Sequence, residues 1–531
     1  MVNINEIYPE DMQRIFVNRT KFLSLLGNMK DSLIRGNIRE NLTLIGLRRI
    51  GKTLIVKEFA KQNQLDNDVI IAYIDLERMD MVPELFAAEY IGAISAWYFK
   101  DKEDIIENYH NLDYTLSKIR EFKEPYNLVF SLKQDLSMVN YNYADAIRKA
   151  FQFPDILASA ADKKIIIIFD EFQEIRGLNN YQNIDILKIF RSIMQTQSNV
   201  LYIFLGSAIS FMEQVFKEST SPLYLQSRIE YVDYLTREDS IMLSKNILGN
   251  SENLYRIYEL TNGHPYYIYS LCKRLESISD TGIEYINNEK INEAFVIEAL
   301  TTGGRIYNLC HYVLENSINR ARGSTLLKSI LKIIAKDPDL RISDIAKGIK
   351  RPVGATRNLI NRLKDVDLLD ETNGGLFIRD PIMQYWIVHY YFGSELTQEM
   401  VKKSLKQLVS EFQEKYVRAS TELGRAKEYE FKVKLEKAVG LNLDNYISED
   451  GQIEFDLVGK KGKTMYIIEI KWRNKAVDYK DVENFLNKVS LSGFKNVKLY
   501  FVSKTGFTKK AWDLMKKEGI IDVGAEVLTY R

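Results

Sequence analysis

The sequence predicts an α/β protein in which a parallel sheet with a helical lid precedes a small helical module and a second, mixed α/β domain. Short apolar, β-branched runs alternate with helical patterns up to about residue 235. This alternation is typical of a parallel sheet covered on both faces. From there to about residue 320 the pattern is helical. At 531 residues the chain is too long for one hydrophobic core, so we expect two to four domains.

The domain boundaries follow from changes of pattern, since no low-complexity stretch or Gly/Ser linker marks them. We expect a core at residues 1–235 and a helical lid at 236–322. A three-helix module with a hairpin is expected at 323–395, a helical connector at 396–420 and an α/β domain at 421–531.

Composition limits the classes of function. With 46% hydrophobic and 27% charged residues, the chain resembles ordinary soluble globular proteins. No apolar run approaches the roughly 20 residues of a membrane helix, and the first residues lack the apolar core of a signal peptide. Cys272 and Cys310 lie far apart, which argues against a disulfide framework and a structural zinc site. We expect a cytoplasmic protein without membrane contact, whose metal would be a hard cation held by carboxylates.

Charge is distributed unevenly along the chain. Residues 401–531 hold 26 Lys and Arg against 19 Asp and Glu, a balance of +7, whereas the whole chain balances at +1. A basic end on an acidic body indicates that a polyanion meets the C-terminal part. Random variation in solvated surface is the alternative.

The elements of the first domain can be assigned in order. Residues 1–40 are expected to be helical, with an apolar stripe around Phe22 and Leu26. Apolar runs at 42–45, 69–76, 165–169 and 200–205 predict four strands. The aromatic-rich stretch 80–160 between the second and third of these predicts helices.

A glycine loop joins the first predicted strand to a helix over 54–62. Residues 46–53 fit the phosphate-binding pattern G-x-x-x-x-G-K-[ST], in which backbone N–H groups wrap a phosphate chain at a helix N-terminus. Lys52 is expected to neutralise β- and γ-phosphate charge, and Thr53 to ligate Mg²⁺. The ATP-contacting residues assigned to the loop are Gly46, Arg48, Arg49, Gly51, Lys52, Thr53 and Leu54.

Later segments supply the partners of this loop. Asp170 ends the third predicted strand, where it can hold Mg²⁺, and the neighbouring Glu171 can polarise the attacking water. Ser207 ends the next strand and is either a sensor of the γ-phosphate or a turn residue. Arg228 is either directed at the nucleotide of a neighbouring subunit, which would imply a homo-oligomer, or engaged in a salt bridge.

These segments together resemble a known family. GLRRIGKT, IIIIFDEFQEI, FLGSAISFM, PLYLQSR and TNGHPYY, in this order, are similar to the archaeal-type AAA+/STAND-related P-loop ATPases. The resemblance covers about residues 10–275. It implies that Asn18 and Arg19 read the adenine side and that Pro265, in a G-x-P lid motif, lies near the nucleotide. Many members of that family change shape between nucleotide states.

Residues 325–392 resemble a winged helix. Short helices are expected near 342–346 and 355–364, followed by a hairpin with its tip at 373–375. Four basic side chains are candidates for contacts with DNA phosphates, namely Lys350, Arg351, Arg357 and Arg362. Winged helices also serve as protein-contact or lid modules, and this alternative stays open.

Two carboxylates and a lysine stand together near the end of the chain. Asp456 lies on one predicted strand, and Glu469 and Lys471 lie two residues apart on the next, so that both face the same side. Two carboxylates can hold Mg²⁺, or Mn²⁺ in its place, while the lysine orients water or stabilises the phosphate. The spacing Asp-x12-Glu-x-Lys resembles the signature of the PD-(D/E)XK, restriction-endonuclease-like nucleases.

The flanking segments of this domain supply further candidates. Glu428 lies on the apolar stripe of a predicted helix and is expected to point inward to the site, whereas Glu430 points elsewhere. Residues 499–512 resemble the closing strand and helix of restriction endonucleases. Lys504 and Lys509 in that segment are candidates for holding the phosphate backbone.

The sequence therefore predicts an ATP-regulated, magnesium-dependent DNA endonuclease with DNA as its expected nucleic acid. A role in defence or DNA repair follows from the resemblance alone. One alternative is a nucleotide-switched DNA-binding or signalling ATPase with an inactive nuclease fold. Another is an ATPase motor whose C-terminal domain only docks on branched DNA.

Overall fold

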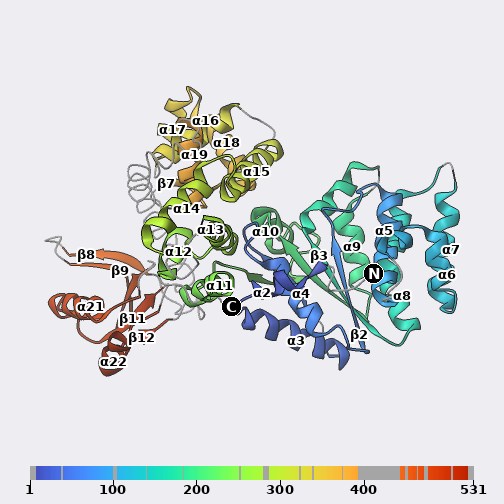
Figure 1. Ribbon diagram of the computed structural model, residues 1–531, viewed down its shortest axis with the longest axis horizontal. Helices are drawn as coiled ribbons and strands as arrows, with labels where there is room; N and C mark the ends of the chain where they lie inside the picture. Colours follow the sequence, from blue (N-terminus) through green and yellow to red (C-terminus); the bar gives the residue numbers. More distant parts are fainter. Residues whose placement is uncertain are drawn as a thin grey trace. The chain divides into compact units, whose positions relative to one another are not determined.

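The structure is a computed structural model, and Figure 1 shows its course. It forms two compact units, Met1–Asp233 and Tyr234–Arg531. None of the helices within the described ranges is both long and apolar enough to cross a bilayer. The described residues are 7–37, 40–99, 105–138, 140–182, 184–249, 253–278, 286–321, 325–337, 340–372, 375–392, 443–448, 453–462, 464–471, 476–503 and 506–523.

A parallel sheet forms the centre of the first unit, with its strands in the order β2-β3-β4-β1-β5. All four expected strands are confirmed. The fifth strand was missed because it lies at the sheet edge and carries the polar sequence SRIEY instead of an apolar run. The strands are β1 (Asn41–Ile45), β2 (Val69–Asp75), β3 (Lys164–Asp170), β4 (Val200–Gly206) and β5 (Ser227–Tyr231).

Helices connect these strands and confirm the helical pattern expected for residues 80–160. Right-handed crossovers place α4, which links β1 to β2, on one face of the sheet and the later connections on the other. The helices are α2 (Glu10–Arg14), α3 (Thr20–Ile34), α4 (Lys52–Gln62), α5 (Pro83–Phe99), α6 (Leu112–Lys118), α7 (Lys123–Leu136), α8 (Tyr143–Ala160), α9 (Ile186–Met194) and α10 (Ile209–Lys217), with 3-10 helices η1 (Ile106–His110) and η2 (Phe172–Asn180).

Aromatic side chains fill the core between the sheet and its helices. The Phe169 ring on β3 stacks on Tyr202 of β4 at a centroid distance of 5.9 Å, and Phe190 of α9 meets Tyr202 edge-on at 4.9 Å. All three rings are almost fully buried. This packing holds the ends of β3 and β4, where the expected catalytic and sensor residues lie.

The second unit begins with helices, as the pattern after residue 235 predicts. They are α11 (Arg237–Leu248), α12 (Leu254–Thr261), α13 (Pro265–Ile278), α14 (Asn288–Leu300) and α15 (Arg305–Arg320). Three further helices and a hairpin follow as α16 (Thr325–Lys336), α17 (Ile342–Gly348), α18 (Val353–Asp365), β6 (Leu369–Thr372), β7 (Gly375–Ile378) and α19 (Pro381–Phe392).

A buried hydrogen bond joins these two groups of helices. The Tyr267 hydroxyl on α13 donates to the Asp380 carboxylate at 2.6 Å, and the other oxygen of Asp380 accepts from the first N–H groups of α19. Burial raises the pKa of Asp380, and the bond from Tyr267 opposes this shift. The contact fixes α19 against α13.

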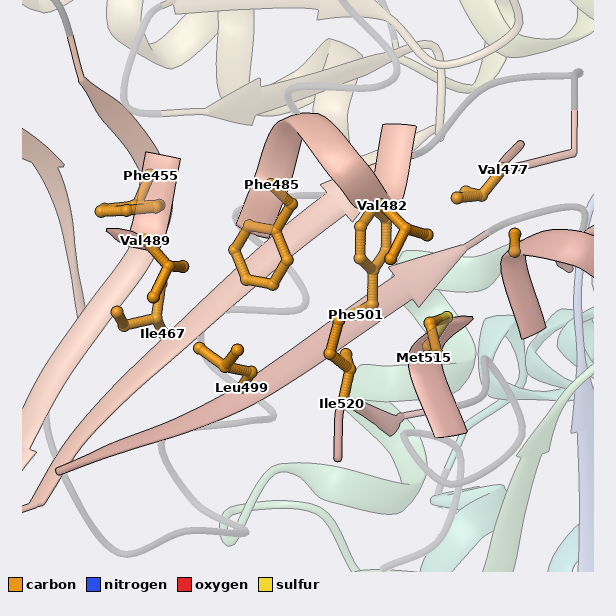
Figure 2. Close-up of a cluster of buried hydrophobic side chains, with 11 residues drawn as sticks. Phe455, Ile467, Val477, Val482, Phe485, Val489, Leu499, Phe501, Met515 and Ile520 are labelled. Atoms are coloured by element: carbon orange, nitrogen blue, oxygen red, sulfur yellow. The ribbon is translucent and has the colours of Figure 1, made fainter. Parts of the chain in front are cut away.

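The last part of the chain forms a mixed sheet in the order β12-β11-β10-β9-β8. β9 is antiparallel to β8 and β10, whereas β10, β11 and β12 are parallel. Figure 2 shows the core beneath α21, where Phe485 and Val482 lie against side chains of the strands. The elements are β8 (Asp444–Ile447), β9 (Glu454–Lys461), β10 (Thr464–Lys471), α21 (Tyr479–Leu491), β11 (Val497–Ser503), α22 (Lys509–Lys517) and β12 (Ile521–Asp522).

Candidate functional sites

The loop between β1 and α4 has the shape that a phosphate-binding loop requires. A Cβ on Gly46 would lie 2.5 Å from the carbonyl oxygen of Val232, so no larger residue fits there. Gly51 has a φ of 103°, a conformation that residues with a Cβ rarely adopt. The two glycines of the pattern are therefore demanded by the backbone itself.

Lys52 lies inside this loop with only 4% of its surface exposed. Its Nζ donates to the carbonyl oxygens of Gly46 at 2.8 Å and Leu47 at 3.0 Å. Burial lowers the pKa of Lys52, while Glu171 and Asp170 oppose the shift. The ammonium group is thus held by weak neutral acceptors that phosphate oxygens can replace.

Asp170 and Thr53 meet at the expected place. The Asp170 Oδ2 accepts from the Thr53 hydroxyl at 2.7 Å and from the Tyr73 hydroxyl at 2.7 Å. Burial raises the pKa of Asp170, and these two hydrogen bonds oppose the shift. Tyr73 was missed, although a single hydroxyl in the apolar strand VIIAYID was a usable signal.

Glu171 is held by a separate set of contacts. Its backbone has a φ of 51°, which is uncommon for a residue with a side chain. Its Oε2 accepts from the Ser207 hydroxyl at 2.6 Å and from Gln173 Nε2 at 2.5 Å. Burial alone would raise the pKa of Glu171, but Lys52 and these hydrogen bonds lower it. Ser207 therefore contacts the acid expected to orient water, and Gln173 is a partner that the sequence did not reveal.

Five other predicted nucleotide residues lie within or beside the loop. Arg19 donates to the carbonyl oxygens of Ile50 at 3.2 Å and Asp233 at 2.7 Å, so it braces the loop. Asn18 precedes it and also has a positive φ. Arg48 pairs with Glu77 at 2.7 Å. Arg49 is exposed and Leu54 half-buried, and their contact with nucleotide stays a prediction.

Arg228 and Pro265 are placed differently from the loop residues. Arg228 lies within β5 and donates twice to Glu230 Oε1, at 2.9 and 2.7 Å. This is the salt bridge that the sequence left as the alternative to an intersubunit role. Pro265 begins α13 in the second unit, and its proximity to nucleotide stays a prediction.

The structure brings Asp456, Glu469 and Lys471 together on β9 and β10. Glu469 accepts from Lys471 Nζ at 2.5 Å, and Asp456 Oδ2 accepts from the Ile470 backbone N–H at 2.6 Å. The alternating Ile468 and Ile470 contribute to the core on the opposite face, as expected. The three candidate side chains thus gather where the two strands pair.

An irregularity of β9 helps to place Asp456. The register of β9 against β8 shifts by one residue between Val458 and Phe455. Both of these side chains contribute to the core under α21, whereas Leu457 belongs to the opposite core. By alternation from Val458, Asp456 faces the α21 side together with Glu469. The extra residue is a β-bulge, a feature that often re-aims a side chain beside an active site.

The electrostatics of this pair favour a cation. Burial and the neighbouring Glu469 charge raise the pKa of Asp456 to about 6. Glu469 is only 3% exposed, and within the described parts of the chain its Oε2 has no hydrogen-bond partner. Two crowded carboxylates with an unsatisfied oxygen fit a hard divalent ion. No described group of three or more His, Cys, Asp or Glu forms a metal site.

A second lysine, missed from the sequence, reaches the same carboxylate. Lys488 Nζ on α21 lies 3.3 Å from Glu469 Oε1. Lys488 follows the buried Phe485 by three residues and is half-exposed, so nothing in the local pattern distinguishes it from a surface lysine.

Some predicted nuclease residues lie outside the described residues, namely Glu428, its alternative Glu430, and Lys504, as does the connector expected at 396–420. Lys509 is exposed in the first turn of α22. There the Thr508 side chain accepts from the Ala511 N–H at 3.4 Å.

Three of the four basic residues proposed to contact DNA are exposed, namely Lys350 and Arg351 in the turn between α17 and α18, and Arg357 on α18. Arg362 is half-buried and donates to the carbonyl oxygen of Ala321, which differs from the expected outward orientation. Its guanidinium packs α18 against the end of α15. The isolated bridge between Leu340 and Leu376 adds a short third segment beside the hairpin.

Two family comparisons agree with this geometry. Residues 16–271 match the family described as an ATPase domain predominantly from Archaea. Residues 431–527 match the family described as restriction endonuclease. No curated protein matches the chain. The chain therefore carries an archaeal-type ATPase domain with a P-loop sheet near its N-terminus and a restriction-endonuclease domain near its C-terminus.

Solved structures give similarities at low sequence identity. The Walker-type ATPase of Pyrococcus abyssi is 17% identical, with a TM-score of 0.45, over 70% of this chain and 96% of that one. The ORC2 protein of Aeropyrum pernix, in ADPNP and ADP complexes, is 11% identical, with a TM-score of 0.42, over 74% and 94%. The RuvB Holliday junction branch migration motor of Thermotoga maritima is 12% identical, with a TM-score of 0.34, over 72% and 97%.

Proposed function

We propose that this protein binds and hydrolyses ATP and that its nucleotide state regulates a magnesium-dependent DNA endonuclease domain. The observation that carries the proposal is the gathering of Asp456, Glu469 and Lys471 at one point of the nuclease sheet. The same chain holds a preformed phosphate loop whose Thr53 and Asp170 are already in contact. A chain with both sites can couple one to the other.

At the nucleotide site, the loop residues and Lys52 would hold the phosphates of ATP. Thr53 and Asp170 would hold Mg²⁺, because a hydroxyl and a carboxylate are its usual protein ligands there. Glu171 would orient the attacking water, with Ser207 and Gln173 fixing its carboxylate. Asn18 and Arg19 would read the adenine side, and Pro265 would close over the nucleotide from the lid.

At the nuclease site, Asp456 and Glu469 would hold Mg²⁺, or Mn²⁺ in its place. The bound ion would lower the pKa of a water and stabilise charge on the phosphate. Lys471, whose Nζ lies beside Glu469, would bind a phosphate oxygen or orient the water. Glu428 would complete the acidic set.

Contacts with DNA would spread beyond the nuclease site. The helices α16 to α18 with the β6–β7 hairpin support a winged-helix assignment, in which Lys350, Arg351 and Arg357 would contact phosphates. Lys509 and Lys504 would do so in the nuclease domain. We further propose a cytoplasmic role in defence or DNA repair, and an oligomer in which Arg228 leaves Glu230 for the nucleotide of a neighbouring subunit.

The test is cleavage of plasmid and oligonucleotide substrates by the full chain with Mg²⁺ or Mn²⁺. One set of reactions contains no nucleotide, a second contains ATP, and a third contains a non-hydrolysable ATP analogue. Cleavage that needs the metal and changes between nucleotide states supports the proposal. Intact ATP hydrolysis with no cleavage of single-stranded, duplex or branched DNA contradicts it and favours a nucleotide-switched DNA-binding protein.

Replacing Ser207 by alanine is expected to lower kcat for ATP hydrolysis about tenfold with little change in KM, because one charge-assisted hydrogen bond to Glu171 is lost. That bond helps to lower the pKa of Glu171. Its loss should therefore move the acidic limb of the pH–rate profile to higher pH. Ser192→Ala is the control, since its hydroxyl donates to the α9 backbone carbonyl of Ile189, away from Glu171. An unchanged profile would contradict this role.

Metal binding at the nuclease site is expected to weaken in mild acid. The pKa of Asp456 is raised to about 6, so protons compete with the metal below that pH. The apparent Mn²⁺ affinity, measured by calorimetry on the full chain, should be about tenfold lower at pH 5 than at pH 7. A carboxylate of ordinary pKa would be almost fully ionised over this range. Constant affinity from pH 5 to pH 7 would contradict the prediction, because it would show either that the pKa of Asp456 is ordinary or that Asp456 is not a ligand.

A further inference from the structure

Helix α21 is fixed on the nuclease sheet by its apolar side chains. Val482, Phe485 and Val489 are buried in the same core as Phe501 of β11, as Figure 2 shows. The rings of Phe485 and Phe501 meet edge-on at a centroid distance of 5.4 Å. These contacts set the rotation of the helix about its axis. Lys488, three residues after Phe485, is consequently directed toward the strands, although part of its side chain stays exposed to solvent.

The ammonium group of Lys488 contacts the carboxylate of Glu469. Its Nζ lies 3.3 Å from Glu469 Oε1, and the same oxygen accepts from Lys471 Nζ at 2.5 Å. The Glu469 side chain is 4% exposed, whereas that of Lys488 is 36% exposed. One carboxylate oxygen therefore carries two ammonium groups, while Oε2 has no hydrogen-bond partner in the described ranges.

The formal charges of these side chains indicate that the metal-bound site would need an anion. Asp456 and Glu469, when ionised, are balanced by Lys471 and Lys488, so the four groups are neutral together. A divalent ion on the carboxylates would leave an excess of two positive charges at a half-buried place. A phosphodiester is the anion that a nuclease site receives, and it would offset part of this excess.

The two lysines are not equivalent in this respect. Lys471 makes the shorter contact and lies on the same strand as Glu469. Lys488 makes the longer contact, comes from a different element and has the more exposed side chain. Lys488 is thus the group that can leave Glu469 at the least cost and turn toward solvent, where the phosphate backbone would arrive.

We propose that Lys488 is a phosphate-binding residue of the nuclease site, held by Glu469 in the free protein and released to the DNA backbone. The proposal rests on the nuclease function proposed above. It adds a cation that the Asp-x12-Glu-x-Lys pattern does not contain. It also requires that Lys488 compete with the metal for Glu469. Removing Lys488 should therefore strengthen metal binding and weaken DNA binding.

The experiment compares the full chain with Lys488→Ala, Lys488→Arg and the control Lys480→Ala. Lys480 is exposed on the same helix, so its replacement removes the same charge away from Glu469. Mn²⁺ binding is measured by calorimetry without DNA. The affinity for a short duplex is measured in Ca²⁺ and in EDTA over a range of salt concentrations, so that the metal-dependent part of binding is isolated.

Lys488→Ala is expected to bind Mn²⁺ about threefold more tightly, because a competing cation is gone. Its metal-dependent duplex affinity should fall about tenfold, the loss of one charge-assisted hydrogen bond. The slope of log affinity against log salt should become shallower by about 0.9, the value of one phosphate contact. Lys488→Arg and Lys480→Ala should resemble the wild type in all three.

Four results would overturn the proposal. Weaker Mn²⁺ binding in Lys488→Ala would show that this lysine only positions Glu469. Duplex affinity and salt slope equal to those of Lys480→Ala would show that it touches no phosphate. If the wild type binds the duplex with the same affinity in Ca²⁺ and in EDTA, DNA binding does not depend on metal, and the metal-linked phosphate contact that we propose is absent. A wild type that binds no Mn²⁺ would overturn the proposed nuclease function as well. The failure of that function can therefore be distinguished from the failure of the Lys488 proposal alone.

Discussion

Replacing Asp456 by asparagine is expected to abolish metal-dependent cleavage while making the metal-free protein more stable. The amide cannot supply the charge that holds a divalent ion, and the loss of about 4 kcal/mol of transition-state stabilisation corresponds to about a thousandfold in rate. The side chain keeps its size, and its oxygen can still accept from the Ile470 N–H. ATP hydrolysis, which uses other residues, should continue.

The gain in stability follows from the pKa of Asp456, which burial and Glu469 raise to about 6. The folded state binds this proton more tightly than the unfolded chain does. Stability is therefore lost as the pH rises from about 4 to about 6, and the ionised carboxylate costs free energy at pH 7. Asparagine removes that cost.

Cleavage assays, Mn²⁺ calorimetry and hydrogen exchange of β9 and β10 in EDTA would check these outcomes. Asp513→Asn is the control, since Asp513 is an exposed aspartate on α22. A variant that still cleaves would show that Asp456 holds no metal. Faster exchange than in the wild type would show instead that the carboxylate stabilises the free protein.

Sequence spacing predicted part of the candidate nuclease site but not all of it. The two-residue interval between Glu469 and Lys471 fixed a common face in advance, because side chains alternate along a strand. The bulge in β9 could not be foreseen, because it depends on pairing with β8 and not on the sequence around Asp456. Lys488 could not be foreseen either, since its distance to Glu469 is set by the packing of α21 on the sheet.

The first unit shows the same division between local and distant information. Four strands were apparent from apolar runs, but β5 was not, because a polar edge strand owes its place to pairing with β1. The loop and the acids were predictable from their motif. The contact of Tyr73 with Asp170, and that of Gln173 with Glu171, depend on side-chain directions that no spacing rule supplies.

The helical module shows where a pattern misleads. Arg357 and Arg362 lie on one helix, and both were expected to face outward. Arg357 is exposed, but Arg362 is half-buried and is bound by the carbonyl oxygen of Ala321 at the end of α15. Helical spacing predicts which face of a single helix meets solvent. It does not predict which side chains a neighbouring helix covers, because that depends on the fold. Charge alone therefore overstates the surface available to a polyanion here.

Replacing Lys52 by alanine is expected to weaken ATP binding at least about a hundredfold and to make hydrolysis undetectable. In the free protein Lys52 is almost fully buried and donates to Gly46 and Leu47 within the loop. The variant loses both the cation that would meet the phosphates and the two bonds that hold the loop open. Because Asp170 and Glu171 lie near this ammonium, their charges would also repel the triphosphate more strongly.

The matched control is Lys61→Ala, a lysine on the same helix whose side chain binds Gln13 and not the loop. Fluorescent nucleotide titration and phosphate release would measure binding and turnover, and cleavage would be followed in the same preparations. If nucleotide regulates the nuclease, Lys52→Ala should cleave at the rate of the nucleotide-free wild type, whether or not ATP is added. If its cleavage still responds to ATP, the regulating nucleotide binds elsewhere, and the phosphate loop is not the switch.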